Sequence, residues 1–121
     1  MDIKIPGLNA ASGLELCDGI EEIYLRSLRL YVSNMPAYLE KIKNVSKETL
    51  PDYAISVHGV KSISEYIGAE ETKKTAKQLE LMAKNGDLAG VLAANEAFLK
   101  DAQDLVDKIR DWLEKNAAWA Q

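Results

Sequence analysis

Hydrophobic residues recur every three or four positions along most of this 121-residue chain, and no segment alternates with a period of two for long enough to predict a β-strand. A short helix is predicted from about Ala10 to Cys17, with Asn9 as its N-cap. A long helix follows from about Gly19 to Asn44, and Pro36 is expected to kink or divide it because proline lacks a backbone donor. The apolar positions of the long helix form one stripe: Ile20, Ile23, Tyr24, Leu28, Tyr31, Met35, Tyr38, Leu39, Ile42 and Val45.

Two further helices are separated by a glycine. The first begins near Thr49, a favourable N-cap, and is expected to run to about Ile67 and stop at Gly68. The second runs from about Ala69 to Asn85 and ends at Gly86, because glycine readily takes the left-handed conformation that closes a helix.

A last long helix is predicted from Leu88 to about Ala117, capped by Asp87. Its apolar stripe has the spacing of bundle packing: Val91, Leu92, Asn95, Phe98, Leu99, Ala102, Leu105, Val106, Ile109, Trp112 and Leu113. Four substantial amphipathic helices with short connections predict an all-α fold, an up-down antiparallel four-helix bundle. We expect residues 1–121 to form this single domain, with the short N-terminal helix covering one end.

The charge and cysteine content narrow the classes of function. A net charge of -4 argues against nucleic acid as a partner, because neutralising phosphates needs a concentrated basic patch. Cys17 is the only cysteine, so the chain can form neither an internal disulfide nor a cysteine-based metal site. The sequence has no apolar run of membrane-spanning length and no signal peptide after Met1. We therefore expect a cytoplasmic protein without a membrane partner.

The only histidine, His58, lies in the predicted helix that ends at Gly68. At 3.6 residues per turn, Lys61, Ser62 and Glu65 fall on the same side of that helix, together with Ala54. The opposite side carries the residues expected in the core: Tyr53, Ser56, Val57, Val60, Ile63, Ser64 and Ile67. His58 is therefore predicted to stand in solvent on an exposed stripe.

A lone histidine is more often an ordinary surface or core residue than a functional one. Without clustered cysteines or a second histidine it makes a weak zinc site, and no strand–turn–helix elbow suggests a catalytic triad. An exposed imidazole is nevertheless a good nucleophile near pH 7, and it could accept a phosphoryl group. Lys61, one turn on, would offset part of the anionic charge, and the small Ser62 would leave room for a partner.

The segment from His58 to Ala69, HGVKSISEYIGA, resembles the signature of histidine-containing phosphotransfer (HPt) domains. That signature has a lysine three residues after the histidine, then glycine, a small residue and serine, and later Gly-Ala. The segments AKQLE (76–80) and AKNGD (83–87) are similar to the next helix of the family, and residues 5–24 resemble its approach to the first long helix. The one clear departure is Ser62, which stands where the family has glycine.

The resemblance implies that His58 is phosphorylated on its outer ring nitrogen. It implies that Lys61 balances the phosphoryl charge, and that Glu80 hydrogen-bonds the inner nitrogen and fixes the tautomer. A solvated helix charge is the alternative for Glu80. Lys77 could be a second cation near the phosphoryl group, although an ordinary surface lysine is the more common situation. The partner is expected to bind the patch formed by Ala54, Ile55, Ser62 and Glu65.

The implied partners are a response-regulator receiver domain, a hybrid sensor histidine kinase, or both, and we expect the chain to be a monomer. The resemblance implies no cofactor on this chain, with Mg²⁺ on the receiver, and the sequence contains no ATP-cradling loop. Two alternatives remain open: a bundle that binds proteins without being phosphorylated, and an unrelated bundle with a coincidental motif. Met1 and a complete bundle favour a free-standing protein over a piece of a larger kinase.

Overall fold

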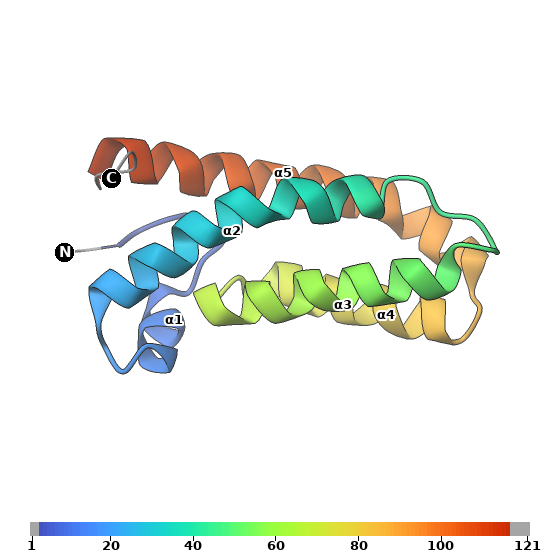
Figure 1. The fold of residues 1–121 in the computed structure, drawn as a ribbon, viewed down its shortest axis with the longest axis horizontal. Helices are drawn as coiled ribbons and strands as arrows, with labels where there is room; N and C mark the ends of the chain where they lie inside the picture. Colours follow the sequence, from blue (N-terminus) through green and yellow to red (C-terminus); the bar gives the residue numbers. More distant parts are fainter. Residues whose placement is uncertain (1–2, 117–121) are drawn as a thin grey trace.

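The computed structural model of the chain describes residues 3–116, which contain five α-helices and no β-strand. The helices are α1 (Ala10–Leu16), α2 (Glu21–Lys41), α3 (Leu50–Ile67), α4 (Glu70–Lys84) and α5 (Leu88–Asn116). The four long helices run antiparallel to their neighbours along the chain (Figure 1). Both α2 and α4 pack against α3 and α5, so the four long helices enclose one apolar core. The predicted all-α four-helix bundle is confirmed.

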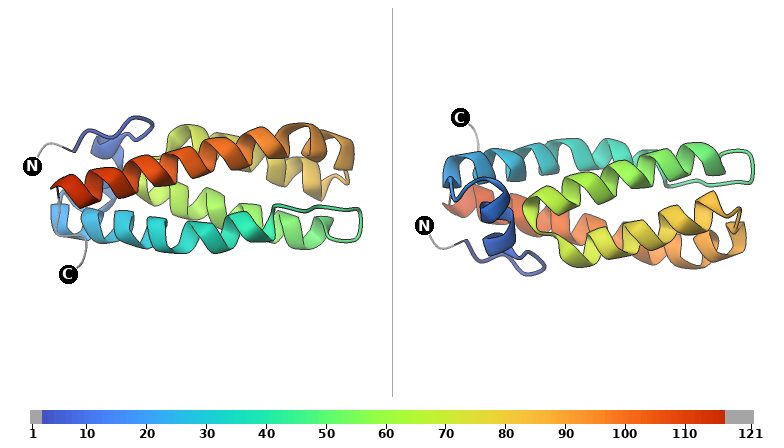
Figure 2. Two further views of the ribbon diagram at one scale, coloured as in Figure 1. Left: turned by 90° about the horizontal axis from the view of Figure 1, so that it is seen from above. Right: turned by 90° about the horizontal axis from the view of Figure 1, so that it is seen from below.

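α1 lies across one end of the bundle, where α3 gives way to α4 (Figure 2). The Asn9 side chain accepts a hydrogen bond from the Ser12 backbone, as expected of an N-cap. The Asn9 backbone donates to the Gly68 carbonyl at 2.9 Å, and the Tyr24 hydroxyl donates to the Ile67 carbonyl at 2.7 Å. Gly68 has a φ of +78°, and a Cβ there would collide with the Asn9 carbonyl oxygen. These contacts fix the end of the helix that carries His58.

Pro36 was expected to kink or divide this helix, and it does not divide it, since α2 continues through the proline. Proline removes one backbone hydrogen bond from a helix interior, which costs about 3 kcal/mol. Met35 and Leu39, on either side of Pro36, are both buried in the core. Packing of this apolar face holds the helix together across the proline, since most helix stability in proteins comes from tertiary contacts.

A few predicted details differ from the structure. Ile20, Ile23 and Leu92 are 49%, 42% and 54% exposed, because each lies at the edge of its apolar stripe. Thr49 is the residue before α3, but its hydroxyl accepts from the Ser46 backbone instead of capping the helix. Asp87 does cap α5 by accepting from the Gly90 backbone. The predicted end of this helix at residue 117 lies outside the described residues.

A buried polar chain joins α3, α5 and the end of α2. The Tyr53 hydroxyl donates to Asn95 Oδ1 at 2.7 Å, and Asn95 Nδ2 donates to the Ile42 carbonyl at 2.8 Å. Burial raises the pKa of Tyr53, which keeps its hydroxyl protonated as a donor. All three residues are at most 5% exposed, so water does not replace a lost partner.

The Asn95→Ala variant is expected to lower the free energy of unfolding by about 2 kcal/mol, because it leaves the Tyr53 hydroxyl and the Ile42 carbonyl without their partner. Urea unfolding followed by circular dichroism measures this change. Asn34→Ala, at an exposed asparagine of α2, is the control and should change stability by less than about 0.5 kcal/mol. Equal losses in the two variants would contradict the assigned role of the buried chain.

Candidate functional site

α3 carries His58 near its middle and lies between α2 and α4 (Figure 2). On the side of α2, Gly59 lies against Tyr38, and a Cβ at position 59 would collide with the tyrosine ring. The glycine therefore allows α2 to approach α3 next to the histidine. The His58 side chain is 55% exposed, so the predicted solvent position of the imidazole is confirmed.

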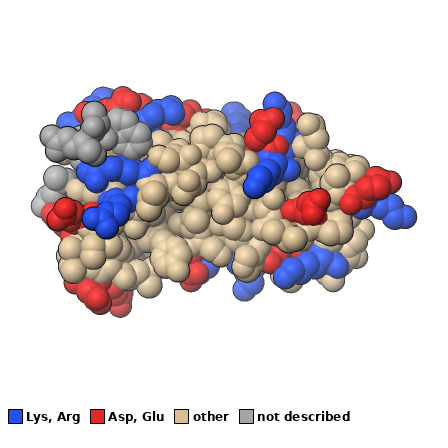
Figure 3. Space-filling model, in the orientation of Figure 1, with Lys and Arg blue, Asp and Glu red and all other residues tan. Residues whose placement is uncertain are grey.

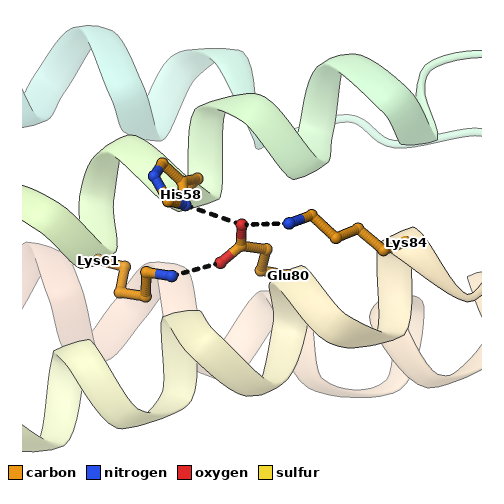
Figure 4. Close-up of polar contacts among 4 residues, drawn as sticks. All are labelled: His58, Lys61, Glu80 and Lys84. Carbon is orange, nitrogen blue, oxygen red and sulfur yellow. Dashed lines mark hydrogen bonds and ion pairs between the residues drawn. The ribbon is translucent and has the colours of Figure 1, made fainter.

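The inner nitrogen of the imidazole is bonded to α4. His58 Nδ1 lies 2.8 Å from Glu80 Oε2, and the rest of the ring points away from the carboxylate (Figure 4). An ionised carboxylate only accepts hydrogen bonds, so Nδ1 carries the proton and donates it. In the neutral ring this leaves the lone pair on Nε2, the outer nitrogen. The contact that the family resemblance implied for Glu80 is therefore present.

Glu80 is 4% exposed and is the only buried charged side chain among residues 3–116. Lys61 Nζ donates to Oε1 at 2.8 Å, and Lys84 Nζ lies 3.0 Å from Oε2 (Figure 4). Burial alone raises the pKa of Glu80, but hydrogen bonds from both lysines and the imidazole outweigh burial and lower that pKa from 4.5 to about 2. The carboxylate is therefore ionised at neutral pH, and it holds the proton of the imidazole on Nδ1.

Two lysines of α4 that lie seven residues apart, Lys77 and Lys84, differ in their contacts. Lys77, the predicted second cation, is exposed on α4, whereas Lys84 makes the contact with Glu80. Sequence reasoning missed Lys84, although a signal was present. Residues four apart on a helix are neighbours, and Glu80 and Lys84 have the favourable order of acid before base.

The structure shows how exposed each residue of the predicted partner patch is, while binding of a partner there stays a prediction. Ile55 is 72% exposed, Ser62 is half-buried, and Glu65 is exposed and paired with Lys73 at 3.1 Å. Ala54 was expected on the exposed stripe but is buried, at 7% exposure. It lies one turn before His58, and its methyl group is too short to reach past the closely packed helices.

An uncharged surface covers part of α2 and α3. Figure 3 shows a broad area without charged side chains over α2 and α3, with most acidic and basic groups around it. Leu30 of α2 and Tyr66 of α3 are 54% and 63% exposed, and both line a groove together with the half-buried Ile63. The charged cluster around Glu80 lies on the α4 side of His58 (Figure 4).

Within residues 3–116 there is no group of three or more His, Cys, Asp or Glu side chains placed to hold a metal ion. None of the helices in that range is long and apolar enough to cross a membrane. Trp112, expected in the apolar stripe of the last helix, is half-buried against the core, and Trp119 lies outside the described residues.

Comparison with known proteins identifies the family. No curated protein and no solved structure matches the chain. The family model named Hpt domain matches residues 26–112, a range that holds α3, α4, the histidine and all three partners in the Glu80 cluster. The Hpt domain is a histidine phosphotransfer module of two-component signalling. Because the match covers well over half of the chain, the chain belongs to the Hpt domain family.

Proposed function

We propose that His58 accepts a phosphoryl group on Nε2 from the aspartyl phosphate of a receiver domain and passes it to the aspartate of another receiver. The observation that carries this proposal is the hydrogen bond between Nδ1 and the buried Glu80 carboxylate, which leaves the outer nitrogen exposed with its lone pair. A histidine serving only the core would not need a solvent-exposed ring held in one tautomer.

The phosphoryl transfer needs no general base, because no proton has to be removed from His58. The Nε2 lone pair forms a bond to phosphorus while the bond between phosphorus and the aspartate oxygen breaks, and the aspartate leaves as a carboxylate with the electron pair. The ring keeps its proton on Nδ1 and becomes a phosphorylated imidazolium. Glu80 stabilises that positive charge from 2.8 Å away. The reverse reaction passes the phosphoryl group on.

The proposal places the Mg²⁺ on the receiver, which would neutralise the phosphoryl oxygens and the leaving aspartate. It also gives the chain no ATP-dependent kinase activity of its own. The only cysteine, Cys17, has no second cysteine to pair with, which suits the reducing cytoplasm, where we expect the exchange to take place.

The proposal is tested by incubating the chain with a panel of phosphorylated receiver domains from the same organism. We expect one receiver or more to transfer the label, and the product to be acid-labile and base-stable, as a phosphohistidine is. Because the chain has a single histidine, mass spectrometry should locate the label at position 58. Receivers that bind tightly but transfer nothing would favour the adaptor alternative, and a label on any other residue would overturn the proposal.

The exposed apolar residue Ile55, one turn before His58 on α3, provides a test of where the receiver docks. The Ile55→Asp variant is expected to raise the KM for a phosphorylated receiver about tenfold, with little change in the maximal rate, because a charge must be desolvated when the receiver covers it. Leu92→Asp is the matched control, since Leu92 is a similarly exposed apolar residue on α5. Transfer kinetics measured against receiver concentration separate the two effects. An unchanged KM in the Ile55 variant would exclude this residue from the docking surface.

A further inference from the structure

Two lysines from different helices hold the same buried carboxylate. Lys61 of α3 binds Glu80 Oε1, and Lys84 of α4 binds Oε2, which also accepts from His58. Glu80 is therefore paired with more positive charge than a single carboxylate requires. Phosphorylation of His58 would add negative charge beside this carboxylate, and the second lysine can be explained by that added charge.

Lys61 can bind either of two anions, the Glu80 carboxylate or a phosphoryl group on His58. In the structure its ammonium group is bonded to Glu80 at 2.8 Å and its side chain is only 23% exposed, so it is committed to the carboxylate. A phosphoryl group on Nε2 brings a second anion to the site, and Lys61 is the lysine one turn from His58 on the same helix. If Lys61 turned to the phosphoryl group and Lys84 were absent, the buried carboxylate would keep only the imidazolium, whose charge is already offset by the phosphoryl group, and the loss of both lysine partners is unfavourable.

We infer that Lys84 is a positioning residue that keeps Glu80 paired when Lys61 leaves the carboxylate to contact the phosphoryl group on His58. This inference rests on the proposed phosphotransfer through His58. Lys84 acts through Glu80 and does not contact the transferred group. Lys61 can therefore change its partner from Glu80 to the phosphoryl group, while the buried carboxylate stays paired with Lys84.

The arrangement in space suits this division of roles. Figure 4 shows the two lysines reaching Glu80 from opposite sides, with Lys61 on the side toward which the outer nitrogen of the ring points. Lys84 is on the far side, beyond the oxygen that it shares with His58. Lys84 is thus placed to stay on Glu80, and Lys61 is placed to reach the phosphoryl group.

The charges of the site also balance only when both lysines are counted. A phosphoryl dianion on an imidazolium ring carries a net charge of about -1 near neutral pH. Together with the Glu80 carboxylate this makes two negative charges, which the ammonium groups of Lys61 and Lys84 neutralise. With one lysine missing, the phosphorylated site keeps an uncompensated negative charge in a partly buried position.

The test is a mutant cycle of Lys61→Ala and Lys84→Ala, measured in the full chain with a receiver that phosphorylates it. Two quantities are followed for each variant: the equilibrium constant of phosphotransfer and the free energy of unfolding of the unphosphorylated chain. Lys84→Arg tests rescue, because arginine can hold the same carboxylate. Lys74→Ala, at another exposed lysine of α4, is the matched control.

If Lys61 changes partner, the Lys84→Ala substitution should affect the phosphotransfer equilibrium mainly when Lys61 is present, and the free energy of unfolding mainly when Lys61 is absent. Lys84→Ala should lower the equilibrium constant about tenfold when Lys61 is present, since Lys61 must then serve both anions. When Lys61 is absent the same substitution should change that constant little, because Glu80 then loses the same partner before and after transfer. Unfolding should show the reverse: a small effect with Lys61 present and a larger one without it. Lys84→Arg should restore the wild-type equilibrium constant, and Lys74→Ala should match wild type.

The outcomes distinguish this inference from the function on which it rests. If the wild-type chain takes no phosphoryl group from any receiver, the proposed function fails and the inference fails with it. If the wild type is phosphorylated but Lys84→Ala lowers the equilibrium constant equally in both backgrounds, Lys84 acts only as a nearby charge and the change of partner is overturned. The same conclusion follows if Lys84→Ala and Lys74→Ala behave alike.

Discussion

The His58→Gln variant is expected to take no detectable phosphoryl group from a receiver that phosphorylates the wild-type chain. The substitution removes the only imidazole of the chain, and a carboxamide nitrogen has no lone pair available to attack phosphorus. Transfer is followed as radioactive or mass-spectrometric label on the chain at a fixed receiver concentration. The Lys74→Ala variant from α4, labelled in parallel, should behave as wild type.

Loss of labelling in this variant is informative because the fold should survive. The histidine side chain is more than half exposed, and glutamine can still donate a hydrogen bond toward Glu80 from the same helix face. We expect the free energy of unfolding to change by less than about 1 kcal/mol, as for most exposed positions. Retained labelling in a folded His58→Gln chain would show that another residue accepts the group, and base-lability of that label would point to a carboxylate.

The sequence predicts the bundle and the core of the site because each depends on helical phase. The three- and four-residue spacing of apolar positions defines the buried faces of α2 to α5, and the same phase places His58 and Lys61 near each other on α3. Glu80 becomes predictable only through the resemblance of Leu79-Glu80 to the family pattern, since periodicity within α4 does not reveal which residue of α3 it meets.

The burial of Ala54 and the contacts of the α4 lysines depend on how neighbouring helices pack, which the periodicity of a single helix does not predict. Ala54 has the phase of an exposed residue but is covered, because its side chain ends at the methyl group while α4 packs closely on α3. Lys77 and Lys84 are seven residues apart on the same face of α4, so phase treats them alike. The favourable order of acid before base indicates the contact of Lys84 with Glu80, but it does not reveal that Glu80 also meets His58 of the neighbouring helix.

The Glu80→Gln variant is expected to be less stable than wild type at neutral pH, and most of the difference should be lost as the pH falls to about 2. The ionised carboxylate pairs with two lysines and accepts from the imidazole, so its pKa is lowered to about 2 in the folded chain from an ordinary value of 4.5. A carboxyl group with a lowered pKa in the folded state stabilises the fold above its unfolded pKa, and that stabilisation is lost as the group becomes protonated. The shift corresponds to at most about 3 kcal/mol.

The pH window of this effect follows from the same two values. Above about pH 5 the carboxylate is ionised in both states, so the wild-type chain holds its full advantage over the glutamine variant. Between about 4.5 and 2 the unfolded chain binds the proton first, and the advantage falls. At about pH 2 roughly half of the folded wild-type chains carry a protonated, neutral Glu80, so most of the advantage over the glutamine variant is lost. Urea unfolding of the pair at several pH values measures the difference directly, which cancels the titration of every other carboxylate. A difference that stays constant from pH 6 to pH 2 would mean that the charge of Glu80 does not stabilise the fold, and that the two lysines are held near it by other contacts.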